Sequence, residues 1–423
     1  MIRRVAFVMA LAFTAGVIGC NESLDSGAVC PSLCPQQAAN LRDTVLTPVL
    51  VFDSTFVGYP VRGTENGMLL ANRGDTLQVV GIVRFDTLTN IYLPPLDSAH
   101  HIVHLDSALL RLIVDTTKAT IPDSVRFDLY DVDDLTASDT SAAAVLAKFV
   151  PSRLIGGSSF VGTAIHDTIR VTLTPSAVLA KITANVRLRI GIQVSGSGSV
   201  SMRAHTTETL APAQLRYRPT LDTNVAPILV SPLSRTPAAD SEPRVALTDF
   251  TLVSKYNMPA TLNTMSVGGM PGRRAYLRFD IPKNISDSTT IVRATLRLNQ
   301  VPLAFGGPRD SLLVYAQIVL AGPQLTDLRR AATIIGGPGL LLSDSIFVRP
   351  TASGLQTLEL FRVVRAWAAQ SSLKSPPPRA VVLRAAFEGV AASELRFSST
   401  TAPAALRPSM RITYVPKLTF GVP

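Results

Sequence analysis

The sequence contains the same arrangement of short motifs twice, about 190 residues apart, which indicates that one folding unit has been duplicated. Arg84-Phe85-Asp86 recurs as Arg278-Phe279-Asp280, and Arg203-Ala204-His205-Thr206 recurs as Arg396-Phe397-Ser398-Ser399. Order and spacing are kept between the two copies. A chain of this kind is constrained to fold into two similar units. A length of about 400 residues also exceeds what one hydrophobic core usually organises, which favours two domains.

Both copies are dominated by strand patterns. Val186 to Val194 alternates apolar and polar residues, and Leu277, Phe279 and Ile281 alternate with polar neighbours in the same way. Gly, Pro and Ser separate these runs, and Ser195 to Ser199 is expected to close a hairpin. Many short strands with such punctuation favour antiparallel β-sandwiches.

One short helix is expected in each copy. Thr174-Pro175 is typical of a helix start, and Leu179 and Ile182 would then share a face. In the second copy Phe361, Val364 and Trp367 recur at a spacing of three and share a face. We therefore expect Trp367 to be a core residue at the end of a sandwich.

The N-terminal residues indicate export and anchoring. Arg3 and Arg4 precede an apolar stretch, Val5 to Ile18, that is too short to span a bilayer. The stretch ends at Val17-Ile18-Gly19-Cys20, which resembles a bacterial lipobox and implies lipidation of Cys20. An ordinary secretory peptide with an incidental cysteine is the alternative. We expect a protein of the cell envelope, anchored by lipid and most consistent with the outer membrane.

Cys30 and Cys34 are the other two cysteines, and outside the cytoplasm they can form a disulfide. The predicted organisation is a signal peptide over residues 1–19, a tether over 20–43, a first sandwich over 44–219, a Pro-rich linker over 220–242, a second sandwich over 243–416 and a tail over 417–423.

The second copy resembles the DNRLRE domain, also called the disaggregatase-related repeat, an extracellular module related to carbohydrate-binding modules. Three segments carry the resemblance: Tyr276-Leu277-Arg278-Phe279-Asp280, the strand Ile291 to Leu298, and Val364-Arg365-Ala366-Trp367. The first copy keeps some of these landmarks but has no Trp and carries an insertion. The resemblance implies an all-β protein of two tandem jelly-roll-like antiparallel sandwiches, each with one short helix.

Arginine is frequent at predicted outward strand positions, and its fork of donors suits carboxylate ligands such as uronic acids. Arg278 and Arg297 are the candidates that we select for an anionic polysaccharide, with a solvated sheet face as the alternative. The full set is Arg84, Arg111, Arg126, Arg187, Arg189, Arg278, Arg297, Arg396 and Arg411. The net charge of +10 permits acidic partners, whereas the export signal and the lack of a basic run disfavour nucleic acid.

Two metal-site hypotheses arise in the first copy. Asp128, Asp131 and Asp133 can supply oxygens to calcium at a strand end, although the second copy has no matching cluster. His100 and His104 can share a strand face, but no further ligand has an equivalent spacing. A polar loop is the alternative for both groups, and no cofactor is otherwise expected.

No nucleophile motif or catalytic constellation stands out. The predicted function is therefore a non-catalytic binding or structural protein with modules similar to carbohydrate-binding modules. The alternative is a polysaccharide-degrading enzyme, since some lyases are β-sandwiches that use Arg, His and Tyr.

Overall fold

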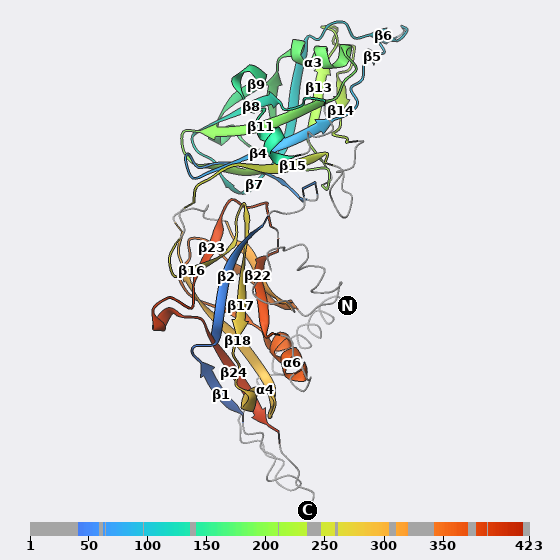
Figure 1. Cartoon of the computed structure of the whole chain (residues 1–423). Coiled ribbons are helices and arrows are strands. Elements are labelled where there is room, and N and C mark those ends of the chain that lie inside the picture. Colours follow the sequence, from blue (N-terminus) through green and yellow to red (C-terminus); the bar gives the residue numbers. More distant parts are fainter. Residues whose placement is uncertain are drawn as a thin grey trace, which may run out of the picture.

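The computed structural model describes residues 41–58, 62–63, 65–95, 97–135, 141–209, 211–234, 247–258, 261–303, 310–319, 342–370, 378–386 and 388–417. Figure 1 shows two β-rich bodies stacked end to end. Both are built from antiparallel sheets, which confirms the all-β prediction. The signal peptide, Cys20, Cys30, Cys34 and most of the predicted tether and tail lie outside the described residues.

The first sandwich contains one sheet of eleven strands in the order β10-β9-β8-β11-β4-β3-β12-β7-β13-β14, with β15 paired to β4. An additional pairing of β10 with β7 joins distant parts of this path, so the sheet closes on itself like a barrel, whereas a sandwich of two facing sheets was predicted. The names first and second sandwich are kept below for the two bodies. Its strands are β3 (Met68–Asn72), β4 (Leu77–Phe85), β7 (Ser107–Thr120), β8 (Ser124–Asp131), β9 (Leu154–Val161), β10 (Thr168–Leu173), β11 (Leu188–Gly196), β12 (Val200–Ala204), β13 (Gln214–Arg218), β14 (Ile228–Val230) and β15 (Asp249–Tyr256).

The second sandwich also contains eleven strands, in the order β1-β24-β18-β23-β16-β17-β22-β19-β20, with β2 paired to β17 and β21 paired to β18. Its strands are β1 (Arg42–Leu46), β2 (Leu50–Gly58), β16 (Thr264–Gly268), β17 (Gly272–Phe279), β18 (Thr289–Val301), β19 (Leu312–Val319), β20 (Leu342–Val348), β21 (Gly354–Glu359), β22 (Ala380–Ala385), β23 (Glu394–Ser398) and β24 (Ser409–Pro416).

Short helices and one hairpin complete the described structure. The predicted helices are present as α3 (Pro175–Thr183) and α6 (Phe361–Gln370). Three 3-10 turns (Pro151–Arg153, Gly162–Ala164 and Ala404–Leu406) and the helices α2 (Ala142–Leu146) and α4 (Lys283–Ser286) were not anticipated. Strands β5 (Ile91–Tyr92) and β6 (His100–His101) form a separate hairpin at the tip of the first sandwich (Figure 1).

Each sandwich has its own core of alternating inward residues. The second core includes Leu277, Phe279 and Leu296, and Trp367 packs against Phe279 with their ring centroids 5.3 Å apart. Trp367 is 3% exposed, so it is a core residue as predicted. The first core includes Phe85, Phe127 and Tyr217 at corresponding inward positions.

Sheet membership does not follow the order of the chain. β2 lies at the start of the first copy but pairs with β17 of the second, whereas β15 belongs to the second copy and pairs with β4 of the first. In Figure 1 the blue β2 lies among the yellow and red strands, and β15 crosses the green ones. The two halves therefore exchange their first long strands.

This exchange departs from the predicted domain ranges. Residues 42–58 lie in the second sandwich, although 44–219 was predicted as the first, and residues 249–256 lie in the first. Part of the expected linker, 220–242, is β14, which pairs with β13 inside the first sandwich. The chain instead passes from one sandwich to the other twice, between β2 and β3 and between β15 and β16.

The hairpin expected at Ser195 to Ser199 does not form. β11 pairs with β4 and β8, while β12 pairs with β3 and β7, so the segment joins two strands that are not neighbours. Alternation predicted the strands correctly, but pairing depends on contacts far apart in the sequence.

Candidate functional site

A cleft lies where the two sandwiches meet, and both halves of the chain line it. The first half contributes Leu69, Asp115, Lys118, Ser201, Met202 and Arg203, and the second contributes Asp310, Ser311, Leu312, Leu313, Phe347, Ala385, Val390, Ala391 and Ala392. The space enclosed by these side chains is ≈ 100 Å³. Clefts between domains that combine an apolar lining with a few polar groups are common binding sites.

The charged groups of the cleft are held in defined positions. Arg203 and Asp115 form an ion pair with Nη2 and Oδ2 2.9 Å apart. Burial opposes ionisation of Asp115, but the hydroxyl and amide of Thr117 and the charge of Arg203 outweigh it and lower the pKa of the carboxyl. The exposed Lys118 reaches across the junction, where its Nζ donates to the Ser311 carbonyl at 2.9 Å.

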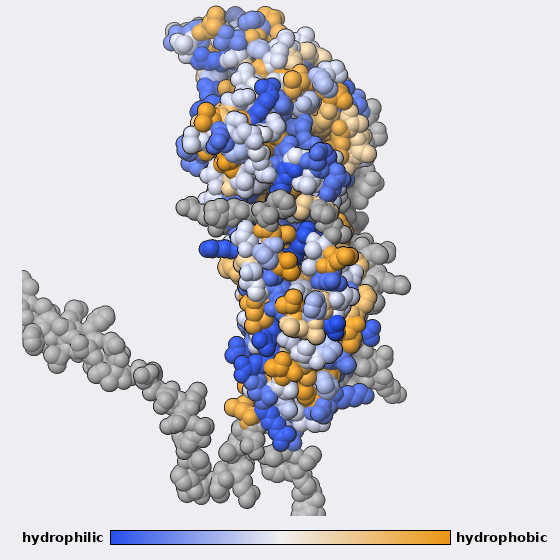
Figure 2. Space-filling view, turned by 90° about the vertical axis from the view of Figure 1, so that its left-hand side faces the viewer, coloured by the Kyte–Doolittle hydropathy of each residue, from blue (hydrophilic) through white to orange (hydrophobic). Residues whose placement is uncertain are grey.

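An exposed aromatic ring lies at the rim of this cleft. Phe347 on β20 is 73% exposed, although most large apolar side chains of the second sandwich are buried. Aromatic faces beside polar groups can pack against the apolar faces of ring-shaped ligands. Figure 2 shows polar and apolar residues interspersed over the visible face of both bodies, without one continuous apolar field.

Charged side chains also make contacts across the junction between the two sandwiches. Arg73 Nη2 donates to Ser393 Oγ at 3.4 Å across the junction. Burial lowers the pKa of Arg73, while the charges of Asp310 and Glu394 counteract that effect. Glu394 in turn accepts from Arg396 at 2.8 Å. These contacts make the junction a packed interface.

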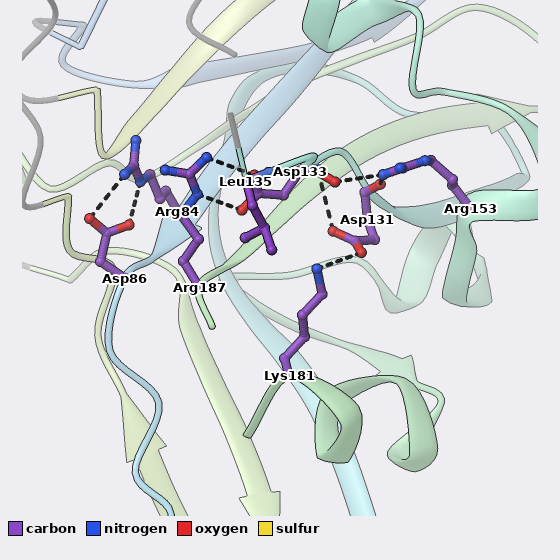
Figure 3. A network of polar contacts seen from close by, with 8 residues as sticks. All are labelled: Arg84, Asp86, Asp131, Asp133, Leu135, Arg153, Lys181 and Arg187. Atoms are coloured by element: carbon purple, nitrogen blue, oxygen red, sulfur yellow. Dashed lines mark hydrogen bonds and ion pairs between the residues drawn. The ribbon is translucent and has the colours of Figure 1, made fainter. Parts of the chain in front are cut away.

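Two of the three calcium candidates, Asp131 and Asp133, lie at and just beyond the end of β8 within a network of cations (Figure 3). Arg187 donates to both carboxylate oxygens of Asp133, at 2.7 Å and 3.0 Å, and Lys181 lies 2.8 Å from Asp131. Asp128 accepts from Arg126 at 2.8 Å. Calcium would therefore compete with an Arg or Lys for each of these carboxylates.

Asp133 is the most tightly held of these groups. Its side chain is buried, which opposes ionisation, but the hydrogen bonds from Arg187 and the Leu135 amide lower its pKa overall. Arg153 also donates to the carbonyls of Asp131 and Asp133. The network has the contacts of a structural brace that fixes the end of β8.

His100 lies on β6 of the β5–β6 hairpin, whereas His104 lies in the segment between β6 and β7. His100 Nε2 is 2.9 Å from Asp97 Oδ2, and its ring lies beside that of Tyr92. Among the described residues, no group of three His, Cys, Asp or Glu side chains is arranged to hold a metal ion. In the same part of the chain, no helix combines the length and hydrophobicity of a membrane span.

The two selected arginines belong to the second sandwich but not to neighbouring strands. Arg278 on β17 is exposed and lies opposite Phe52 of β2, beside an open hollow that also includes Val51 and Asp280. Arg297 on β18 is half-buried between Thr357 and Ser409. The structure therefore does not bring them together into one row, and neither lines the cleft.

Several other arginines predicted to point outward are buried. Arg84, Arg189 and Arg396 are 2%, 2% and 8% exposed. Arg84 forms an ion pair with Asp86 and Arg396 pairs with Glu394, so each charge is neutralised where it is buried. In the first sandwich Val145 of α2 packs in one buried cluster with Val80 and Ile82 of β4, so this outer sheet face is partly covered, which alternation in a single strand does not report.

Sequence reasoning missed the cleft. Its lining residues are far apart in the chain, and Lys118, Asp310 and Phe347 carry no recognisable motif.

Comparisons with known proteins do not identify a family. No protein-family model matches the chain, and no curated protein matches it. Solved structures with some similarity include one described as "BspA_C_mut", at 9% identity over 85% of this chain and 92% of that chain, with a TM-score of 0.14. Another is an infectious bursal disease virus VP2 subviral particle, at 10% identity over 86% of this chain and 80% of that chain, with a TM-score of 0.11. Similarities of this size carry no argument about fold or function.

Proposed function

We propose that this chain is a non-catalytic, lipid-anchored protein of the cell envelope whose two jelly-roll-like sandwiches, similar to carbohydrate-binding modules, bind an anionic polysaccharide. The observation that carries the proposal is the cleft at the junction, where Lys118 and Arg203 lie beside an apolar floor and the exposed ring of Phe347. Arg203 is already paired with Asp115, so a carboxylate of the ligand would pair with Lys118, and a sugar face would pack on the ring.

Binding is tested by a glycan array at low and high salt, followed by titration of each ligand found. Contacts between exposed charges weaken as salt rises, because screening shortens to about 8 Å near physiological ionic strength. Uronate polymers should therefore bind at low salt and dissociate as salt is added. Binding only to neutral glycans, without a salt effect, would contradict the anionic class.

Point variants locate the site. Lys118→Ala and Phe347→Ala should each weaken binding about tenfold, as expected for the loss of a charge-assisted contact or an aromatic face. Lys148→Ala is the matched control, because Lys148 is an ion-paired lysine of the first sandwich that does not line the cleft. The double variant Arg278→Ala, Arg297→Ala tests the surface of β17 and β18. A larger loss of affinity in this variant than in the cleft variants would place the binding site on those strands.

The same ligands address catalysis. Any polysaccharide that binds is incubated with the protein and analysed for new unsaturated or reducing ends. An unchanged chain length is expected for a binding protein, whereas new ends that disappear in the Lys118→Ala variant would identify a polysaccharide-degrading enzyme.

The anchor is tested separately. We expect wild-type protein to fractionate with membranes and to carry acyl mass on its mature N-terminus at Cys20, as the lipobox-like sequence implies. Cys20→Ala that still fractionates with membranes, together with an unmodified N-terminus, would contradict lipidation.

A further inference from the structure

The two exchanged strands carry the same short motif, Asp-x-Thr. In β2 it is Asp53-Ser54-Thr55, and in β15 it is Asp249-Phe250-Thr251. Thr55 Oγ1 accepts from the Ser266 amide at 3.0 Å in the second sandwich. Thr251 Oγ1 accepts from the Leu69 amide at 3.1 Å in the first.

The aspartates make equivalent contacts as well. Asp53 Oδ2 accepts from the Thr400 amide at 2.5 Å, and Asp249 Oδ2 accepts from the Thr207 amide at 2.8 Å. Thr207 and Thr400 directly follow the duplicated segments that begin at Arg203 and Arg396. Each motif thus holds its strand to a receptor that was duplicated with it.

The strands also dock in the same register. Asp53 lies opposite Leu277 and Thr55 opposite Ala275, while Asp249 lies opposite Val83 and Thr251 opposite Gly81. Leu277 and Val83 occupy equivalent places one residue before the duplicated Arg-Phe-Asp segments. Backbone pairing and the Asp-x-Thr contacts are therefore the same in both sandwiches and do not distinguish one donor strand from the other.

Side-chain size does distinguish them. In the second sandwich the small Ser54 lies opposite Tyr276, which is buried between Phe52 and Phe56 at ring-centroid distances of 6.0 and 6.3 Å. In the first sandwich the order is reversed. The large Phe250 lies opposite Ile82, and both belong to one buried cluster.

A strand placed in the wrong sandwich would lose this complementarity. β15 on β17 would set Phe250 against Tyr276, whereas β2 on β4 would set Ser54 against Ile82 and leave a void. Overpacking and cavities both destabilise a buried contact. The pairs therefore select which strand each sandwich accepts.

We propose that the second sandwich has a strand-acceptor site specific for an extended Asp-Ser-Thr strand, and that a second copy of this chain can fill it with its own β2. The second copy is the occupant because its β2 has the same aspartate, threonine and small central residue that the site already holds. Exchange of identical elements between copies is a low-cost route to assembly, since each contact is one that the monomer also makes.

The experiment uses two full-length chains that are unfolded together and refolded under oxidising conditions. The donor carries Phe52→Cys and the acceptor carries Arg278→Cys, because these residues lie opposite each other across β2 and β17. The acceptor's own β2 is disabled by Asp53→Ala and Ser54→Phe. In both chains the native cysteines are replaced by serine: Cys20, Cys30 and Cys34.

A disulfide-linked donor–acceptor dimer is the expected product, identified by mass, at protein concentrations of hundreds of micromolar. High concentration is needed because a tethered strand has an effective concentration of roughly millimolar. A single chain with both Phe52→Cys and Arg278→Cys should close its disulfide internally, which verifies the register. Closure of that control without any mixed dimer would overturn the proposal.

Variants of the donor test the selection rule. Ser54→Phe or Asp53→Ala in the donor should lower the yield of mixed dimer about tenfold, through overpacking or the loss of a charge-assisted hydrogen bond. Tyr276→Ile in the acceptor should restore the yield of mixed dimer with the Ser54→Phe donor, because the two changes together reproduce the Phe250–Ile82 pair. Val57→Cys in place of Phe52→Cys is the matched control out of register, because the exposed Val57 lies opposite Arg273 and not Arg278, and it should give little dimer. Equal yields from all donors would show non-specific cross-linking and refute the site.

Discussion

Leu50 and Leu252 test the strand exchange. Each belongs by sequence to one copy of the repeat but packs in the hydrophobic interior of the other sandwich. Leu50 on β2 is 4% exposed and packs in the second core with Phe279 and Trp367. Leu252 on β15 is 5% exposed and packs in the first sandwich. Chain order alone would assign Leu50 to the first sandwich and Leu252 to the second.

The expected effect follows from burial. Replacing a buried Leu by Ala costs about 2–5 kcal/mol, and Leu50 lies at the start of its strand, where some collapse of the cavity is feasible, so about 2–3 kcal/mol is expected. With an m-value of roughly 2 kcal/mol per molar urea, the midpoint for the second sandwich should fall by about 1 M.

Fluorescence of Trp367, the single tryptophan, reports the second sandwich selectively. Leu50→Ala should lower the urea midpoint of the Trp367 signal. Leu252→Ala should leave that signal unchanged and should instead add an earlier transition in circular dichroism. The opposite pattern would refute the assignment of β2 and β15. Equal shifts of Trp367 in both variants would show that the sandwiches unfold as one unit and refute the argument from separate cores.

Three further predictions follow from the same structure. A protease site introduced within residues 235–246 should yield two fragments that co-elute until they are denatured. The first fragment supplies β2 to the second sandwich, and the second fragment supplies β15 to the first. Fragments that separate in native buffer would contradict the exchange. Burial, reinforced by the charge of Glu208, raises the pKa of Asp249 to about 7. The folded state therefore binds the proton of this carboxyl more tightly than the unfolded state does. The free energy of unfolding should fall as pH rises from about 4 to 7. Asp249→Asn should therefore stabilise the first sandwich by about 2–4 kcal/mol at pH 8 and little at pH 4, and a gain independent of pH in thermal unfolding would refute this. Trp367→Ala should cost about 3–5 kcal/mol of second-sandwich stability in urea unfolding, and a solvent-exposed emission spectrum of the native protein would contradict its burial.

Much of the fold could be predicted from the sequence. Alternation located strands such as β11 and β17, and the Thr174-Pro175 start and the Phe361 to Trp367 spacing located α3 and α6. These predictions succeeded because side-chain period and a proline in the first helical turn are local properties of the chain. The burial of Trp367 followed from the same spacing.

The candidate site could not be predicted in this way. Arg278 and Arg297 have the outward positions expected, but their strands are not neighbours, and the cleft lies elsewhere. Arg84 and Arg189 have the same alternation as exposed arginines and yet are buried. Whether an outward side chain meets solvent depends on what packs over the sheet, which is a property of the tertiary structure.

The duplication is visible as a repeat in the sequence. The β class and the faces of the individual strands also follow from the sequence, because they depend on side chains within a few residues of each other. Which sandwich β2 and β15 complete depends on contacts between residues far apart in the chain. Both strands carry Asp-x-Thr and both sheets offer the same register, so the pattern along the chain is compatible with either pairing. The choice rests on the fit of Ser54 to Tyr276 and of Phe250 to Ile82, and such a fit exists only once residues about 200 positions apart are side by side.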